Sequence, residues 1–282
     1  MSIAVSRYAV VGHPVAHSQS PFIHAAFAAQ TGEPVSYDRL LCPLDGFAPA
    51  LREFAAGGAS GCNVTMPFKF EAFGLVAKTT PRARIAAACN VIRFDTDGWL
   101  GDNTDGAGLV RDIERNAGVD LRGARILLIG AGGGAAGALG PLLASGASEV
   151  VVANRSVDRA RALVDRHVEA LGAAASARVV AAPLDGCGEG FDVVVNATAT
   201  SVAGAAVPVA PSVLRRGGLA LDMMYGRAAA AFVAWAEAHG ARGRDGLGML
   251  VEQAAEAFLL WRGVEPETAP VLRALRERIA VP

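Results

Sequence analysis

One segment near the middle of the chain constrains the fold more than any other. Four large apolar residues at positions 126–129 run directly into the glycine-rich stretch 130–134 and then into alanines. An uninterrupted apolar run bounded by glycine indicates a buried strand, and the small residues after it favour a helix packed closely on that strand. The segment therefore predicts a strand, a tight turn and a helix in direct succession.

The same alternation extends through the chain. Short β-branched or apolar runs alternate with longer alanine- and leucine-rich amphipathic runs, which is typical of an α/β fold with a mainly parallel sheet. Strands are expected at 8–11, 35–41, 61–64, 90–94, 99–101, 125–129, 149–153, 178–181, 191–196 and 219–223. Helices are expected after Ser20 as N-cap up to Gly32, and at 44–56, 66–76, 104–116, 134–143, 157–171, 228–238, 246–261 and 266–279.

We expect two α/β domains. The first spans residues 1–108 and the second, with the glycine-rich turn, spans residues 109–246. A chain of 282 residues is long enough for two cores. The last helices, within 247–282, are expected to return to the first domain, because its sheet needs cover on both faces.

Charge and cysteine content exclude several classes of protein. The chain has 26 Lys and Arg against 27 Asp and Glu, so it lacks the positive field that attracts nucleic acid. Its four cysteines have no zinc-site spacing and are expected to be buried thiols in the cytoplasm. The N-terminus does not look like a signal peptide, and no apolar run is long enough to span a bilayer. His13 and His17 bracket a proline on a loop, so we expect no metal site.

The glycine-rich turn predicts a dinucleotide site. Gly130, Gly132 and Ala135 match G-x-G-x-x-A between a strand and a helix. In that pattern the first glycine permits the turn, the second lets the backbone approach a pyrophosphate, and the helix N-terminus favours the anion. The alternative is a tight turn that serves packing alone.

The end of the next strand indicates which dinucleotide binds. An NAD site usually has an Asp or Glu there to bind the ribose 2′-hydroxyl. This chain instead has Asn154, Arg155 and Ser156, with Arg159 one turn later. Two guanidiniums are suited to a 2′-phosphate, so NADP is favoured over NAD. The alternative is that both arginines are solvated residues at the start of a helix.

Polar residues recur in the first domain at element ends. Ser18 and Ser20 precede a helix, where two hydroxyls and the helix N-terminus favour a carboxylate. Further polar side chains lie at or near strand ends and helix starts, at Asn63, Thr65, Lys69, Asn90 and Asp105. Each has a purely structural alternative, such as a cap or a solvated charge.

Together these residues resemble the shikimate dehydrogenase family. The matching segments, in the family's order, are V-G-H-P at 11–14, S-Q-S at 18–20, N-V-T-M-P-F-K at 63–69, Asn90, G-D-N-T-D-G at 101–106, the glycine turn, N-R-S at 154–156, N-A-T at 196–198, D-M-M-Y at 222–225 and D-G-L-G-M-L-V-E-Q at 245–253. The resemblance implies a substrate domain followed by a Rossmann-type NADP domain. It also implies reversible NADP-dependent interconversion of shikimate and 3-dehydroshikimate, on the route to chorismate and the aromatic amino acids.

The resemblance also implies a role for each matching residue. Lys69 and Asp105 would be the catalytic pair for proton transfer. The substrate carboxylate would bind Ser18 and Ser20, with Tyr225 nearby, and the ring hydroxyls would bind Asn63, Thr65, Asn90 and Gln253. The cofactor would be bound by Gly130, Ala131, Gly132, Gly133, Gly134, Asn154, Arg155, Ser156, Arg159, Thr198, Met223, Gly246 and Met249.

Three departures from the family pattern bear on affinity and ring preference more than on reaction class. They are Val91, the pair Ala135 and Ala136, and the segment 198–201. Two alternatives stay open: a paralogue acting on quinate or an aminoshikimate, perhaps with NAD, and a catalytically silent dinucleotide sensor. We expect a small-molecule substrate and a monomer or homodimer.

Overall fold

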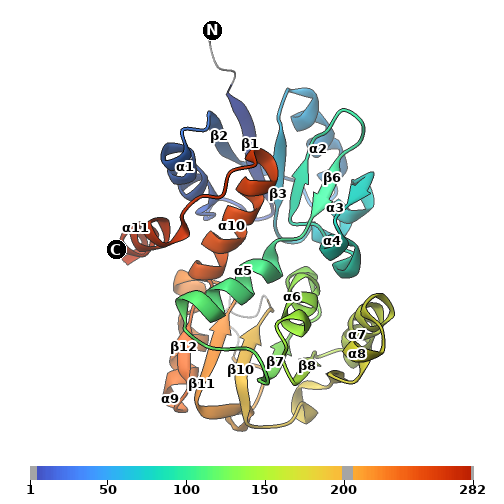
Figure 1. Ribbon diagram of the computed structural model, residues 1–282, viewed down its shortest axis with the longest axis vertical. Coiled ribbons are helices and arrows are strands. Elements are labelled where there is room, and N and C mark those ends of the chain that lie inside the picture. The colour runs from blue at the N-terminus through green and yellow to red at the C-terminus, as the bar shows by residue number, and fades with distance from the viewer. Residues whose placement is uncertain (1–4, 199–205, 281–282) are drawn as a thin grey trace. The chain divides into compact units, whose positions relative to one another are not determined.

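The computed structural model describes residues 5–198 and 206–280 and divides the chain into two compact units. One unit runs to Gly108 and resumes at Leu250, and the other comprises Leu109–Met249. Each unit contains one six-stranded sheet with helices packed on it (Figure 1). The predicted α/β fold with two sheets is confirmed.

The sheet of the first unit has the strand order β2-β1-β3-β5-β6-β4. β1 pairs in parallel with β2 and β3, whereas β5 is antiparallel to both β3 and β6, so the strands expected at 90–94 and 99–101 form a hairpin. The short strand β4, which the sequence analysis did not predict, pairs in parallel with β6. The strands are β1 Ser6–Gly12, β2 Val35–Leu41, β3 Gly61–Val64, β4 Lys78–Thr79, β5 Val91–Arg93 and β6 Leu100–Asp102.

Three predicted helix starts in this unit were wrong, and one helix, α4 (Pro81–Ala86), was not predicted. The helix expected from residue 44 begins at Phe47. Ser20 is the first residue of its helix rather than the N-cap, which is Gln19, because the Ser20 side chain bonds within a polar cluster and caps no backbone group. The helix expected from residue 66 begins at Lys69, because the preceding residues form a turn closed by Phe68 N–H donating to Thr65 O at 3.1 Å. The helices are α1 Ser20–Thr31, α2 Phe47–Ala56, α3 Lys69–Leu75 and α4 Pro81–Ala86.

The last two helices, α10 (Leu247–Arg262) and α11 (Thr268–Ala280), return to the first unit as expected. The Trp261 ring on α10 stacks on Tyr8 of β1 with centroids 4.3 Å apart, and its indole N–H donates to the backbone oxygen of Ile92 at 3.1 Å. α11 packs against α1. The C-terminal segment thereby completes the core of a unit whose sheet was formed by the first hundred residues (Figure 1).

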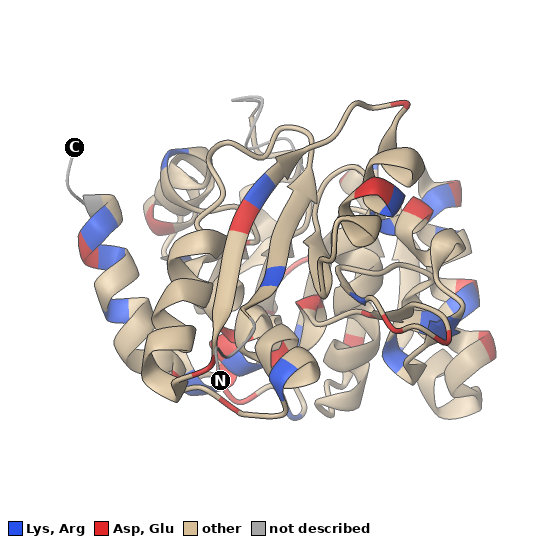
Figure 2. Cartoon of the chain, turned by 90° about the horizontal axis from the view of Figure 1, so that it is seen from above, with Lys and Arg blue, Asp and Glu red and all other residues tan. Residues whose placement is uncertain are grey.

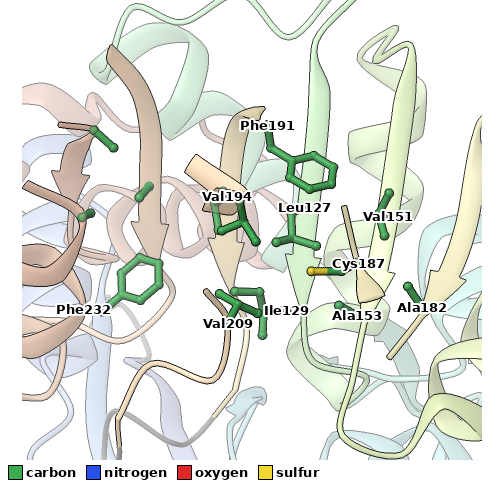
Figure 3. Packing of buried hydrophobic residues seen from close by; sticks show 14 residues of the cluster. Leu127, Ile129, Val151, Ala153, Ala182, Cys187, Phe191, Val194, Val209 and Phe232 are labelled. Atoms are coloured by element: carbon green, nitrogen blue, oxygen red, sulfur yellow. The ribbon is translucent and has the colours of Figure 1, made fainter. Parts of the chain in front are cut away.

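The sheet of the second unit is entirely parallel, with the order β12-β11-β10-β7-β8-β9. Its first strand in sequence, β7, lies between β8 and β10, so the strand order reverses there as in a Rossmann fold. Leu127, Ile129, Val151, Val194 and Phe232 belong to the core cluster of this unit (Figure 3). The strands are β7 Arg125–Ile129, β8 Glu149–Ala153, β9 Val179–Ala182, β10 Phe191–Asn196, β11 Leu214–Asp222 and β12 Arg242–Arg244.

One helix expected at 104–116 is in fact two segments. α5 covers Asp105–Arg111, and a π-helical turn follows at Asp112–Asn116. Asp112 is fully buried and accepts hydrogen bonds from Asn116 and from two nitrogens of Arg244, and these bonds anchor the π turn. The other helices are α6 Gly133–Ala144, α7 Val157–Leu171, α8 Ala173–Ser176 and α9 Ala230–Ala238, with 3-10 turns at Leu184–Gly186, Pro211–Val213 and Gly226–Ala228.

The surface and the cysteines agree with the composition. Acidic and basic residues are interspersed along most of the chain (Figure 2). All four cysteines are buried free thiols, as predicted. Within residues 5–198 and 206–280, no helix is long and apolar enough to cross a membrane, and no cluster of His, Cys, Asp and Glu is arranged to hold a metal ion.

His24 on α1 is fully buried beneath the first sheet. Its ring stacks on Tyr37 with centroids 4.1 Å apart, and the rings of Phe27, Phe258 and Trp261 surround it. Burial lowers the pKa of His24 to about 3, so the folded unit holds the imidazole neutral. In the unfolded chain this side chain takes up a proton near its ordinary pKa of about 6.5.

We therefore expect His24 to destabilise the fold in acid. Between about pH 6.5 and pH 3 the unfolded state binds one more proton at this position, so stability falls as the pH falls, by about 2 kcal/mol at pH 5. His24→Phe, which retains ring stacking, should weaken this dependence. Thermal unfolding of both proteins from pH 8 to pH 4 measures it, and identical pH slopes would contradict the assignment.

Candidate functional site

In the first unit, Lys69 and Asp105 form an ion pair with Nζ and Oδ2 2.6 Å apart. Both residues begin helices, Lys69 at α3 and Asp105 at α5. Their side chains are only 15% and 6% exposed, so the pair lies largely out of water but Lys69 remains reachable. A partly buried ammonium next to a carboxylate can donate a proton to an oxygen placed against it and can stabilise negative charge there.

Asn90 joins this pair to the last part of the chain. Its Nδ2 donates to Oδ1 of Asp105 at 2.9 Å and lies 3.1 Å from Oε1 of Gln253 on α10. Its Oδ1 accepts from the backbone N–H of Thr104 at 2.8 Å. The two oxygens of Asp105 are therefore divided between Asn90 and Lys69, which fixes the rotation of the carboxylate. The Thr104 hydroxyl also bonds Asn90 and Gln253. The sequence analysis did not select Thr104, and its place in the N-T-D motif was the only signal for it.

Asn63 extends the group toward the serines. Its Nδ2 donates to the backbone oxygen of Asn90 at 3.2 Å, and its Oδ1 accepts from the Tyr37 hydroxyl at 2.6 Å. Ser20 is hydrogen-bonded to Ser18, with the two hydroxyl oxygens 3.1 Å apart. Tyr37 thus bonds a predicted substrate residue, Asn63, although the sequence analysis did not select Tyr37.

Thr65 is held close to β1. Its backbone N–H donates to Val11 O at 2.9 Å, and its methyl group lies so near Gly12 that an added Cβ there would be 2.3 Å away. Gly12 is therefore required for Thr65 to sit at the end of β3. Val91, a departure from the family pattern, is fully buried in a core cluster with Tyr8, Tyr37 and Trp261.

The segment that precedes Asp105 is held in place by an arginine. Arg82 forms two hydrogen bonds with Asp102, at 2.8 and 2.6 Å, and a third with Glu256 of α10 at 2.7 Å. Burial tends to raise the pKa of Asp102, but the hydrogen bonds and charge of Arg82 outweigh it and hold that pKa below its usual value. Arg82 therefore ties the loop before Asp105 to the helix that carries Gln253.

In the second unit, the glycine turn follows β7 and opens α6. Gly130 has φ of 115°, and an added Cβ would lie 3.1 Å from Thr198 and 3.2 Å from Ala197, so only glycine fits there. Gly132 is exposed, caps α6 and faces open space, with no atom within 4 Å of an added Cβ. The first N–H groups of α6 lack partners within the helix, so this turn suits a pyrophosphate.

Ala135 and Ala136, which replace polar residues of the family pattern, are buried in α6 and pack inward. Ala131, Gly133 and Gly134 complete the turn. An added Cβ on Gly134 would lie 3.2 Å from the terminal carbon of Met223, so these two predicted cofactor residues are neighbours.

The residues after β8 form the second part of this candidate site. Nδ2 of Asn154 donates to the backbone oxygen of Ser156 at 2.9 Å, which shapes the turn into α7. Arg155 and Arg159 are exposed, and neither guanidinium pairs with another residue within the described part of the chain. Two unpaired cations beside this turn suit a phosphate group.

The remaining predicted cofactor residues follow the carboxyl ends of β10, β11 and β12. The hydroxyl of Thr198 bonds Asn196 at 2.7 Å, and Asn196 in turn bonds Asp222 at 2.9 Å. An added Cβ on Gly246 would lie 2.5 Å from Met223 O, so only glycine permits this approach. Met249 is buried, at 5% exposure, and Tyr225 is half-buried after β11. Of the altered segment 198–201, the part after Thr198 lies outside the described residues.

Three family models match the chain. They are the shikimate dehydrogenase substrate binding domain over residues 10–92, shikimate/quinate 5-dehydrogenase over residues 112–204, and the shikimate 5′-dehydrogenase C-terminal domain over residues 246–276. Together these matches cover most of the sequence.

Relatives match the chain over nearly its whole length. Shikimate dehydrogenase (NADP(+)) of Methylibium petroleiphilum is 64% identical, over 97% of this chain and 95% of the relative. The crystal structure of an Ael1 enzyme from Pseudomonas putida is 41% identical, with a TM-score of 0.85 over 98% of this chain and 99% of that one. The structure of shikimate 5-dehydrogenase from Thermus thermophilus in complex with shikimate is 31% identical, with a TM-score of 0.82 over 98% of this chain and 100% of that one.

Proposed function

Because this chain belongs to the shikimate dehydrogenase family, we propose that it interconverts shikimate and 3-dehydroshikimate by NADP-dependent hydride transfer. The observation that carries the proposal is the Lys69–Asp105 ion pair, with Asn90 joining Asp105 to Gln253. The reaction serves chorismate and aromatic amino acid biosynthesis, with reduction as the cellular direction.

The catalytic pair handles the proton. When NADP is bound, it supplies or accepts the hydride. Reduction of the ketone leaves negative charge on its oxygen, which the Lys69 ammonium stabilises and to which it delivers a proton. Asp105, 2.6 Å from Nζ, orients the ammonium and balances its charge. In the oxidative direction the same amine takes up the hydroxyl proton.

The substrate residues of the first unit hold a ring that carries one carboxylate and several hydroxyls. Ser18 and Ser20 bind the carboxylate, and Tyr225 contributes to the same recognition. The ring hydroxyls bind Asn63, Thr65, Asn90 and Gln253. The hydrogen bonds that join Asn63 to Asn90 and Asn90 to Gln253 support this set, because they hold the amides in one arrangement before substrate arrives.

The cofactor residues of the second unit hold NADP. The turn from Gly130 to Gly134 receives the pyrophosphate, and the open space at Gly132 fits that group. Asn154, Arg155, Ser156 and Arg159 bind the adenosine phosphate, and the two unpaired guanidiniums support this assignment. Met223 and Gly246 would lie against the nicotinamide, and Thr198 and Met249 would complete the set of cofactor residues.

The two assignments define a substrate domain of residues 1–108 completed by 247–282, and an NADP domain of residues 109–246. We place the enzyme in the cytoplasm, where the four buried thiols stay reduced, and expect a monomer or a homodimer.

A panel of substrates and cofactors tests the function. Purified protein is incubated with shikimate or quinate and with NADP or NAD, and the reduced nicotinamide is followed by absorbance. We expect the highest kcat/KM with shikimate and NADP. Faster turnover of quinate with NAD would favour the paralogue, and no turnover with any pair would favour the silent sensor.

Lys69→Ala should lower kcat by about 10²- to 10⁴-fold with little change in KM, because proton transfer matters in the transition state. Steady-state kinetics with shikimate measures the effect. The matched control is Lys78→Ala, which removes the only other lysine of the chain, one that pairs with the exposed Asp97. Near-normal kcat in the Lys69 variant would exclude Lys69 from the mechanism.

Arg155→Ala should raise KM for NADP by roughly tenfold and leave KM for NAD almost unchanged, because only NADP carries the 2′-phosphate. Arg161→Ala is the control, since Arg161 lies on α7, which begins two residues after Arg155, and pairs with Asp158 at 3.0 Å. Equal losses for both cofactors in the Arg155 variant would mean that Arg155 does not recognise the phosphate.

A further inference from the structure

Tyr37 on β2 is hydrogen-bonded to one of the proposed substrate residues, Asn63. The Tyr37 hydroxyl donates to Oδ1 of Asn63 at 2.6 Å. The ring is held on one face by His24, with centroids 4.1 Å apart and planes 7° apart. Stacking fixes the ring, so the direction in which the hydroxyl points is fixed as well.

The direction of the hydrogen bonds follows from the charge state of the phenol. Burial raises the pKa of Tyr37 well above its ordinary value, so the hydroxyl keeps its hydrogen. A neutral phenol has one hydrogen to donate, and Tyr37 gives it to Asn63.

This arrangement determines how the Asn63 amide is turned. Its oxygen faces the Tyr37 hydroxyl, and its nitrogen donates to the backbone oxygen of Asn90 at 3.2 Å. A reversed amide would place its oxygen against that backbone oxygen, which is repulsive, whereas in the observed orientation the Tyr37 hydroxyl supplies the hydrogen that the amide oxygen accepts. The amide is therefore held in one orientation, with its nitrogen on the side of Asn90.

We propose that Tyr37 is a positioning residue that orients the Asn63 amide to donate to a ring hydroxyl oxygen of the substrate. The proposal rests on the proposed function, which supplies the hydroxylated ring. Tyr37 acts on substrate binding rather than on proton transfer, because its hydrogen bonds reach the Lys69–Asp105 pair only through Asn63 and Asn90.

Tyr37→Phe tests the role, since it removes the hydroxyl and keeps the stacked ring. We expect KM for shikimate to rise roughly tenfold and kcat to stay within about twofold of the wild type. Tyr8→Phe is the matched control: Tyr8 lies opposite Tyr37 in the β1–β2 register, is also buried, and its ring is also stacked, on Trp261. That control should leave both constants unchanged.

A double-mutant cycle then tests whether Tyr37 acts through Asn63. In an Asn63→Ala background, Tyr37→Phe should raise KM by less than twofold, because the group it orients is gone. An undiminished tenfold effect there would overturn the proposal. So would a Tyr37→Phe protein with wild-type KM, or one whose KM rises no more than that of Tyr8→Phe at equal thermal stability. A wild-type protein that does not oxidise shikimate would instead refute the proposed function.

Discussion

The polar cluster of the first unit depends on the hydrogen bonds of the Asn90 side chain. It begins the β-hairpin and bonds three partners that are distant in sequence, namely Asp105, Thr104 and Gln253. Because all of these groups are buried, each lost partner would leave a polar atom without water to replace it. The hydrogen bonds of Asn90 therefore hold the start of α5 and the Gln253 side chain of α10 beside it. They also hold Asp105 in position for its ion pair with Lys69.

Much of the fold could be predicted from the sequence because the core strands are short and uniformly apolar. The bounds of β2, β3, β7, β8, β10 and α7 were predicted correctly. The errors fall where tertiary contacts override local preference. Ser20 has the chemistry of an N-cap, but its side chain bonds Ser18. Asp112, through its bonds to Asn116 and Arg244, holds the end of a predicted α-helix in a π turn.

Some residues of the candidate site in the first unit could be predicted from the sequence, and others could not. Motif spacing selected Lys69, Asp105, Asn63 and Asn90, and the structure brings their side chains into one hydrogen-bonded cluster. Tyr37 was missed because it lies in a stretch with the pattern of an ordinary strand, and Arg82 because the helix α4 that carries it was not predicted. Their partners, Asn63 and Asp102, are distant in sequence, and no local pattern indicates such a pairing.

The chain carries only two lysines, and each forms an ion pair with an aspartate, Lys69 with Asp105 and Lys78 with Asp97. Its structural ion pairs at Asp102, Asp112 and Glu33 use arginine, whose guanidinium does not give up its proton. Acetylation modifies side-chain amines and removes their positive charge. Acetylation of this protein has two side-chain targets, and only the one at Lys69 would alter the charge of the polar cluster.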